Sequence, residues 1–187
     1  MYQDNTLLPR EAIRLAALGA LATTPMSYGA LALDIRNFAS RVAGPSLELM
    51  GASVEVLRHE GLIEPVDDAA ESGADTDLRL TDAGQVEMLV LLRSAIRTPF
   101  TDINKLILAL KFRFLHLLSE GDRRLQVEMM IEACEGEIAR LIDLRGQHET
   151  APGYLPEWLD HDIGLTENRL EWLRDFGASL NPDGISK

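Results

Sequence analysis

The chain has 187 residues, 46% of them hydrophobic and 26% charged, and its net charge is −12 at pH 7. This length allows one sizeable core, or a small domain with a helical extension. Divided after Arg97, the two halves carry −6 each, so neither has the basic surplus that attracts nucleic-acid phosphates over long range. The single cysteine, Cys134, excludes an internal disulfide and favours a reducing compartment.

The apolar run Leu15–Ala22 is not expected to be the core of a signal peptide, because the segment before it has no positive bias. No apolar run approaches the length that a membrane span needs. We therefore expect a cytoplasmic protein with no membrane partner.

The first half of the chain predicts three helices in succession. Pro9 precedes a helical pattern over Glu11–Thr23, which Pro25 ends, and a second helix is expected over Ala30–Phe38. The third helix is expected to open at 44–46 and to close on Gly61. Its buried stripe has the spacing of one helix face: Leu47, Met50, Val54 and Leu57.

Two strands separated by a polar loop follow the third helix. They are expected over Leu62–Val66 and Asp77–Leu80, and Pro65 favours a sheet edge for the first. Thr81 is a suitable N-cap for a helix over Asp82–Ile96. Helix, hairpin and helix in this order are typical of a winged helix-turn-helix.

The second half predicts helices alone. After Thr98-Pro99, apolar residues follow a heptad-like spacing that indicates helix–helix packing: Phe100, Ile103, Ile107, Leu110, Phe114 and Leu117. Further helices are expected over Arg123–Arg145 and near Pro156–Leu180, before a tail at Asn181–Lys187. The expected fold class is mainly α with a small β-hairpin wing, comprising a winged helix-turn-helix domain (1–97) and a helical dimerisation and effector domain (98–187).

These C-terminal helices carry more apolar surface than an isolated layer can bury, which predicts a homodimer. The residues expected at its interface are Ile103, Ile107, Leu110, Phe114, Leu117, Trp172 and Phe176.

Four segments resemble the PadR family of transcriptional regulators. They are Ala12–Ile35, Glu60-Gly61-Leu62-Ile63-Glu64, Leu78-Arg79-Leu80-Thr81-Asp82-Ala83-Gly84 and Glu171-Trp172-Leu173. The resemblance implies a dimeric regulator that binds double-stranded operator DNA, with repression as its expected mode.

The chain departs from that family where DNA contacts are expected. Family members place Gly-Thr-Leu-Tyr at the start of the recognition helix, whereas this chain has Glu48-Leu49-Met50-Gly51. The wing segment 64–77 has no base and six acids: Glu64, Asp67, Asp68, Glu71, Asp75 and Asp77. An alternative is therefore a winged-helix protein that has lost DNA binding and acts as an acidic protein-interaction module.

The candidate DNA contacts lie on or beside the second and third helices: Tyr28, Arg36, Arg41, Ser46, Ser53, Arg58 and His59. Arginine and serine near helix ends suit phosphate contacts, and Ser53 and His59 are candidates for base edges. Glu48 or Glu55 would accept from a cytosine amine. The alternative for the arginines is pairing with nearby acids.

No enzymatic motif is present, and no cofactor is expected. The histidines at 59, 116, 148 and 161 have no metal-ligand spacing, so no metal site is expected either. Four aromatic residues either line an effector pocket or pack in the core: Phe114, Trp158, Trp172 and Phe176. The expected partners are operator DNA, a second copy of the chain, and a small-molecule or protein effector.

Overall fold

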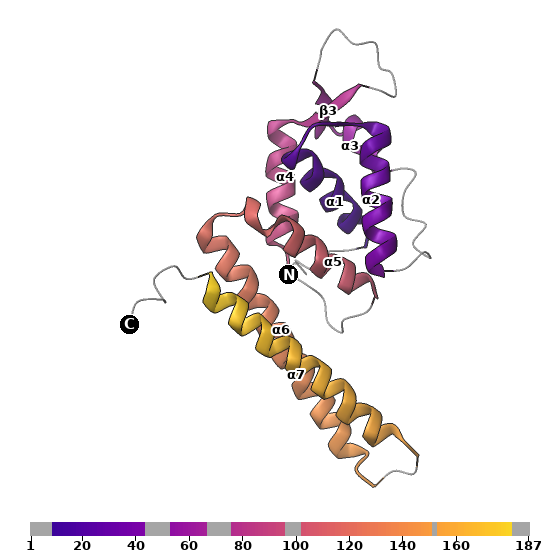
Figure 1. Ribbon diagram of the computed structural model, residues 1–187, viewed down its shortest axis with the longest axis vertical. Coiled ribbons are helices and arrows are strands. Elements are labelled where there is room, and N and C mark those ends of the chain that lie inside the picture. Colours follow the sequence, from indigo (N-terminus) through magenta and orange to yellow (C-terminus); the bar gives the residue numbers. More distant parts are fainter. Residues whose placement is uncertain (1–8, 44–52, 67–75, 96–101, 151–152, 181–187) are drawn as a thin grey trace, which may run out of the picture. The chain divides into compact units, whose positions relative to one another are not determined.

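The computed structural model describes residues 9–43, 53–66, 76–95, 102–150 and 153–180, whose helices and strands form two compact units (Figure 1). The first unit holds α1 (Pro9–Thr23), β1 (Met26–Ser27), α2 (Tyr28–Ala43), α3 (Ser53–His59), β2 (Ile63–Pro65), β3 (Asp77–Leu80), α4 (Asp82–Arg93), α5 (Asp102–Phe114) and the 3₁₀ turn η1 (Leu115–Leu117). The second holds α6 (Glu120–Gln147) and α7 (Leu155–Ser179). The predicted fold class, mainly helical with a small wing, is confirmed.

Helix α1 is the centre of the first unit and lies between α2 and α4 in Figure 1. The run that resembles a signal-peptide core is buried there: Leu15, Ala17 and Leu18 are fully inaccessible. At Gly19 a Cβ would lie 2.6 Å from the ring of Phe114, so a glycine is needed for α5 to approach α1 this closely. Burial on all sides explains why this helix is almost continuously apolar.

The strands form one antiparallel sheet in the order β1-β3-β2. The wing hairpin pairs Ile63 with Leu80 and Glu64 with Arg79, and β1 pairs Met26 with Leu78 on the other side of β3. Strand β2 is therefore an edge strand, as Pro65 predicted. The segment expected to turn the wing, 67–76, lies outside the described residues except for Thr76.

A compact junction joins the end of α3 to the start of α4. Gly61 ends α3 with a φ of 71°, a conformation that favours glycine. The Thr81 hydroxyl donates to the Gly61 carbonyl (2.8 Å) and accepts from the Gly84 N–H (3.0 Å), so Thr81 is the predicted N-cap. A Cβ at Gly84 would lie 2.0 Å from the Leu62 carbonyl oxygen. These contacts explain why the segments Gly-Leu-Ile (61–63) and Leu-Thr-x-x-Gly (80–84) occur together in the sequence.

Helix α5 packs against α1 and α2, within the same unit as the winged helix. Ile107 and Leu110 are fully buried there and Phe114 is 2% exposed, while Leu117 is half-buried. A single chain already buries Ile107, Leu110 and Phe114. The structure therefore corrects the expectation that these three residues lie at the dimer interface. The side chain of Ile103 and the expected domain boundary at 97/98 lie outside the described residues.

Lys111 joins α5 to the end of α4. Its side chain is fully buried, and Nζ donates to the carbonyls of Leu92 (2.6 Å) and Ser94 (2.5 Å). These carbonyls belong to the last turn of α4, where they have no partner within the helix. A cation at this end of a helix is stabilising, because the helix dipole is negative there. Burial lowers the pKa of Lys111 to about 7.

The second unit is an antiparallel pair of long helices. Val127, Met130 and Cys134 of α6 are buried, as are Leu159 and Leu173 of α7. Burial raises the pKa of the Cys134 thiol, which agrees with a packing role for this residue. Ion pairs between the helices join Arg145 to Asp160 (2.9 Å) and Arg174 to Glu135 (2.7 Å).

Within the described ranges, no helix combines the length and apolar character that a membrane crossing requires. Those same ranges bring together no group of three or more metal-ligating side chains.

Candidate nucleic-acid interface

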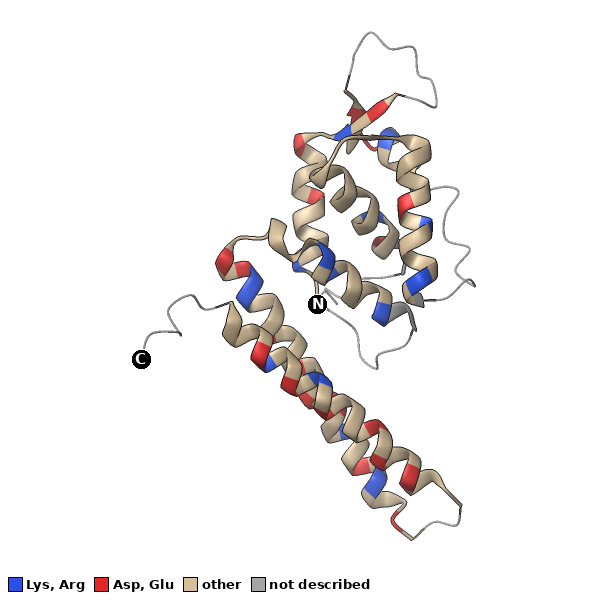
Figure 2. Cartoon of the chain, in the orientation of Figure 1, with Lys and Arg blue, Asp and Glu red and all other residues tan. Residues whose placement is uncertain are grey.

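Helix α2 carries two exposed arginines, Arg36 and Arg41. Neither side chain has a hydrogen bond or ion pair within the described part of the chain. The one acid on this helix, Asp34, is paired with Arg113. Tyr28 begins α2 and is half-buried. The colouring in Figure 2 shows α2 as one of the more basic elements of the first unit.

Helix α3 comprises the seven residues Ser53–His59. Val54 and Leu57 are buried as the stripe predicted, which leaves Glu55, Arg58 and His59 exposed. Arg58 already takes part in an interaction within the chain. Ser53 is the first described residue of the helix, whereas Ser46 and Glu48 lie outside the described residues.

The wing has a cation that sequence reasoning missed. Arg79 on β3 is exposed, and its Nε lies 2.9 Å from Oε1 of Glu64 on the neighbouring strand. The alternation Leu78-Arg79-Leu80 indicates this position, because successive residues of a strand point to opposite faces of the sheet. With Leu78 buried, Arg79 faces outward. The Glu64 carboxylate neutralises Arg79 in this arrangement.

Two further arginines of the first unit connect its helices. Arg14 of α1 lies 2.5 Å from Glu60 and 3.4 Å from Glu87, which joins α1 to the end of α3 and to α4. Its hydrogen bond lowers the pKa of the Glu60 carboxyl. Arg113 of α5 pairs with Asp34 of α2 (2.8 Å). Arg14 and Arg113 therefore connect helices of this unit, whereas Arg36 and Arg41 face outward on α2.

The four aromatic residues expected around an effector pocket belong to different units. Phe114 is in the first unit, where it lines a cavity. Trp158, Trp172 and Phe176 are in α7, where Trp172 and Phe176 stack with ring centroids 5.6 Å apart.

The first unit therefore has the fold of a winged helix-turn-helix protein. The family model described as "Putative AphA-like transcriptional regulator" matches residues 2–177, and the chain belongs to this family. It is accordingly a transcriptional regulator and not an enzyme, as the sequence predicted. No curated protein matches the chain at a significant level.

Among solved structures, the chain is similar to Bacillus subtilis PadR in complex with operator DNA. The identity is 17%, the match covers 90% of this chain and 99% of that chain, and the TM-score is 0.35. This likeness is too weak to transfer the DNA binding of that protein to this chain.

Proposed function

We propose that the chain is a dimeric regulator that binds double-stranded operator DNA through its first unit and represses transcription by occupying the operator. The observation that carries the proposal is the pair of exposed arginines on α2, Arg36 and Arg41, which have no partner among the residues that the structure describes. Arg14, Arg79 and Arg113 of the same unit are paired with acids, whereas two exposed cations on α2 are available for phosphates.

The roles expected of α2 and α3 follow from helix-turn-helix geometry. The first helix of the motif crosses the DNA backbone and the second enters the major groove. In this chain α2 would supply phosphate contacts through Arg36 and Arg41, and Tyr28 at its start would add a hydroxyl. Helix α3 would present Ser53 and His59 to base edges.

The dimer is proposed to form along α7. Three large apolar side chains recur every seven residues and are each at least half exposed: Trp158 (56%), Leu165 (50%) and Trp172 (52%). Such spacing places them in one stripe along a helix, and stripes of this kind are typical of helix–helix interfaces. Another residue expected at the dimer interface, Phe176, extends the stripe through its stacking with Trp172.

The proposal is tested by binding of the purified protein to a labelled fragment of its own promoter across a salt series. The logarithm of the affinity should fall with the logarithm of the salt concentration, by about 0.9 per phosphate contact. Arg36→Ala/Arg41→Ala should weaken binding and lower that slope by about 2.

A matched control removes the same charge from the second unit, in Arg124→Ala/Arg174→Ala. Both arginines are surface partners of acids, Glu120 and Glu135, and such pairs contribute little to stability. The control should bind as the wild type does. Equal losses in both double variants would remove α2 from the interface.

A second candidate function is supported by the wing. Arg79, on the second strand of the wing, is paired with Glu64. The segment 64–77 contains six acids and no base. Such a surface fits a basic protein partner better than a phosphate backbone. Absence of binding to the promoter fragment and to bulk genomic DNA at low salt would favour this acidic interaction module.

A further inference from the structure

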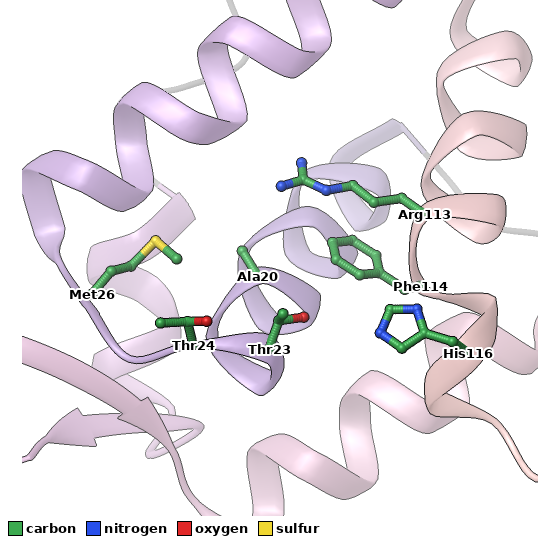
Figure 3. A pocket seen from close by; sticks show the side chains of 7 residues that line it. All are labelled: Ala20, Thr23, Thr24, Met26, Arg113, Phe114 and His116. Atoms are coloured by element: carbon green, nitrogen blue, oxygen red, sulfur yellow. The ribbon is translucent and has the colours of Figure 1, made fainter.

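Helix α4 has an apolar surface on the side opposite its buried face. Four of its residues are buried in the first unit: Gly84, Met88, Leu91 and Leu92. On the other side Val86 is 63% exposed and Val90 is 51% exposed, one turn apart and beside the half-buried Leu89. Neighbouring apolar side chains form a patch, whereas a single exposed one would need no explanation. The cavity shown in Figure 3 is lined by the segment 20–26, α5 and η1, so this patch is a separate surface.

The outward residues of α4 follow the spacing of a helix–helix seam. Four positions separated by four, three and four residues share this side of the helix: Asp82, Val86, Leu89 and Arg93. Paired helices repeat their a and d positions with the same spacing. The two middle positions are apolar, and the two end positions are exposed charges of opposite sign.

This seam is complementary to itself when two copies of α4 align antiparallel. Asp82 then lies opposite Arg93 of a second copy, and Val86 lies opposite its Leu89. A parallel alignment would place acid against acid and base against base, which is unfavourable. Two-fold contacts require such self-complementarity, because each residue meets its counterpart twice. Arg93 also takes part in an interaction within its own chain, and its guanidinium has further donors for a carboxylate.

We propose that the outward face of α4 packs antiparallel against α4 of a second copy. Stable interfaces bury roughly 1,200–2,000 Å² in total, which is more than a seam of three turns can supply. The contact therefore forms within the dimer that α7 holds, and in this respect it rests on the proposed function. It joins the two winged-helix units to each other directly.

The α4 contact would set the distance between the two α3 helices. Within one chain α3 is joined to α4 by the hydrogen bond from the Thr81 hydroxyl to the Gly61 carbonyl (2.8 Å). Docking of α4 on α4 would therefore hold both α3 helices at one separation. A dimer of this kind binds two half-sites whose spacing matches that separation.

Disulfide trapping in the full-length protein tests the contact without DNA. Cys134→Ala removes the only native thiol, and light scattering reports the mass of this background. Val86→Cys and Leu89→Cys variants of the background are then mixed and mildly oxidised. Because positions 86 and 89 lie opposite each other in the antiparallel contact, the disulfide between them should exceed both same-position disulfides several-fold.

Asn37→Cys is the matched control, because Asn37 is exposed on α2 of the same unit. This variant should cross-link only as often as random collision allows, and an equal yield from it would overturn the proposal. A dimer that forms no disulfide between positions 86 and 89 would also overturn it, while the α7 dimer would stand. A monomeric protein without this disulfide would overturn both.

Charge reversal at the ends of the seam tests the alignment. Asp82→Arg would place like charges opposite each other, so the yield of the disulfide between positions 86 and 89 should fall several-fold. Asp82→Arg/Arg93→Asp would restore opposite charges, so the yield should recover. This recovery would distinguish a contact between copies from damage to the fold, because the double variant carries both changes. An unchanged yield in Asp82→Arg, or no recovery in the double variant, would refute the antiparallel contact.

Discussion

Thr81 and Gly84 show how much single side chains contribute to the junction between α3 and the wing. Thr81 binds the chain on both sides of the hairpin, and Gly84 lets the start of α4 approach the Leu62 carbonyl. The absence of a Cβ at residue 84 is thus a packing requirement, since its position within a helix would otherwise favour alanine.

Gly84→Ala should therefore destabilise the first unit by about 1–3 kcal/mol, because its Cβ meets a backbone oxygen that cannot rotate away. Urea unfolding followed by circular dichroism would measure the change. Gly136→Ala is the matched control: it is in α6, has no atom within 4 Å of the added Cβ, and should be neutral or stabilising. Similar effects in both variants would contradict the steric account.

Several residue-scale features were predictable because they depend on local chemistry. Thr81 as a cap, Gly61 as a helix end and Pro65 on an edge strand each follow from the residue and its immediate neighbours. The Arg113–Asp34 pair was not predictable, because its partners are 79 residues apart and only the folded chain brings them together.

At the scale of elements, α5 illustrates what a periodic pattern leaves open. Its heptad-like spacing correctly indicated a buried face, and Ile107 and Leu110 are indeed inaccessible. Periodicity carries no information about which element covers that face, and here α1 and α2 cover it. The seven-residue spacing of Trp158, Leu165 and Trp172 on α7 is present in the sequence, but their exposure within one chain emerged only from the structure.

The attachment of α5 to α4 through Lys111 should make stability depend on pH. The pKa of Lys111 is about 7 when folded, below its value of 10.5 when unfolded, so the unfolded chain binds more protons between these values. The free energy of unfolding should therefore rise with pH across that window, and the penalty is fully present below pH 7.

The measurement is urea unfolding at pH 6, 7, 8 and 9 for the wild type and for Lys111→Met. The difference between the two proteins isolates this lysine from all other titrating groups. The free energy of unfolding should rise less steeply with pH in Lys111→Met than in the wild type. Parallel profiles would show that the buried amine does not lose its proton in this range.

The wing is a second element whose contribution can be measured. Glu64→Gln would release Arg79, and if the first unit binds DNA, the affinity should increase and the salt slope should steepen by about 1. Asp77→Asn removes the same charge from an exposed position on β3 and serves as the control. Equal gains would assign the effect to net charge and not to the release of Arg79.

At the scale of the whole molecule, the two units differ in what they offer to partners. The second unit is strongly acidic: α6 has seven acids and four bases, and α7 has six acids and two bases (Figure 2). Its exposed apolar stripe is flanked by charge, as in many dimer helices. The first unit carries the exposed arginines of α2, Arg36 and Arg41. Self-association and DNA contact are thus proposed for separate surfaces.

Leu165→Glu should test the proposed dimer. A carboxylate in the middle of the stripe would have to lose water on association, so the dimer dissociation constant should rise by about 100-fold or more. Ala178→Glu adds the same charge on another face of α7 and should leave the dimer intact. Light scattering across a dilution series would report the mass, and an unchanged mass in Leu165→Glu would refute the stripe as the interface.

The stripe also determines what spectroscopy can observe in this protein. Both tryptophans of the chain, Trp158 and Trp172, belong to α7, so intrinsic indole fluorescence reports the second unit alone. Because both indoles are on the proposed interface, dilution should shift their emission to longer wavelength as they become hydrated. The only thiol, Cys134, is buried in the same unit, so its labelling rate would follow the opening of that helix pair. Neither tryptophan emission nor the labelling rate of Cys134 would report changes in the winged-helix unit. A tryptophan introduced there would be needed to observe DNA binding by fluorescence.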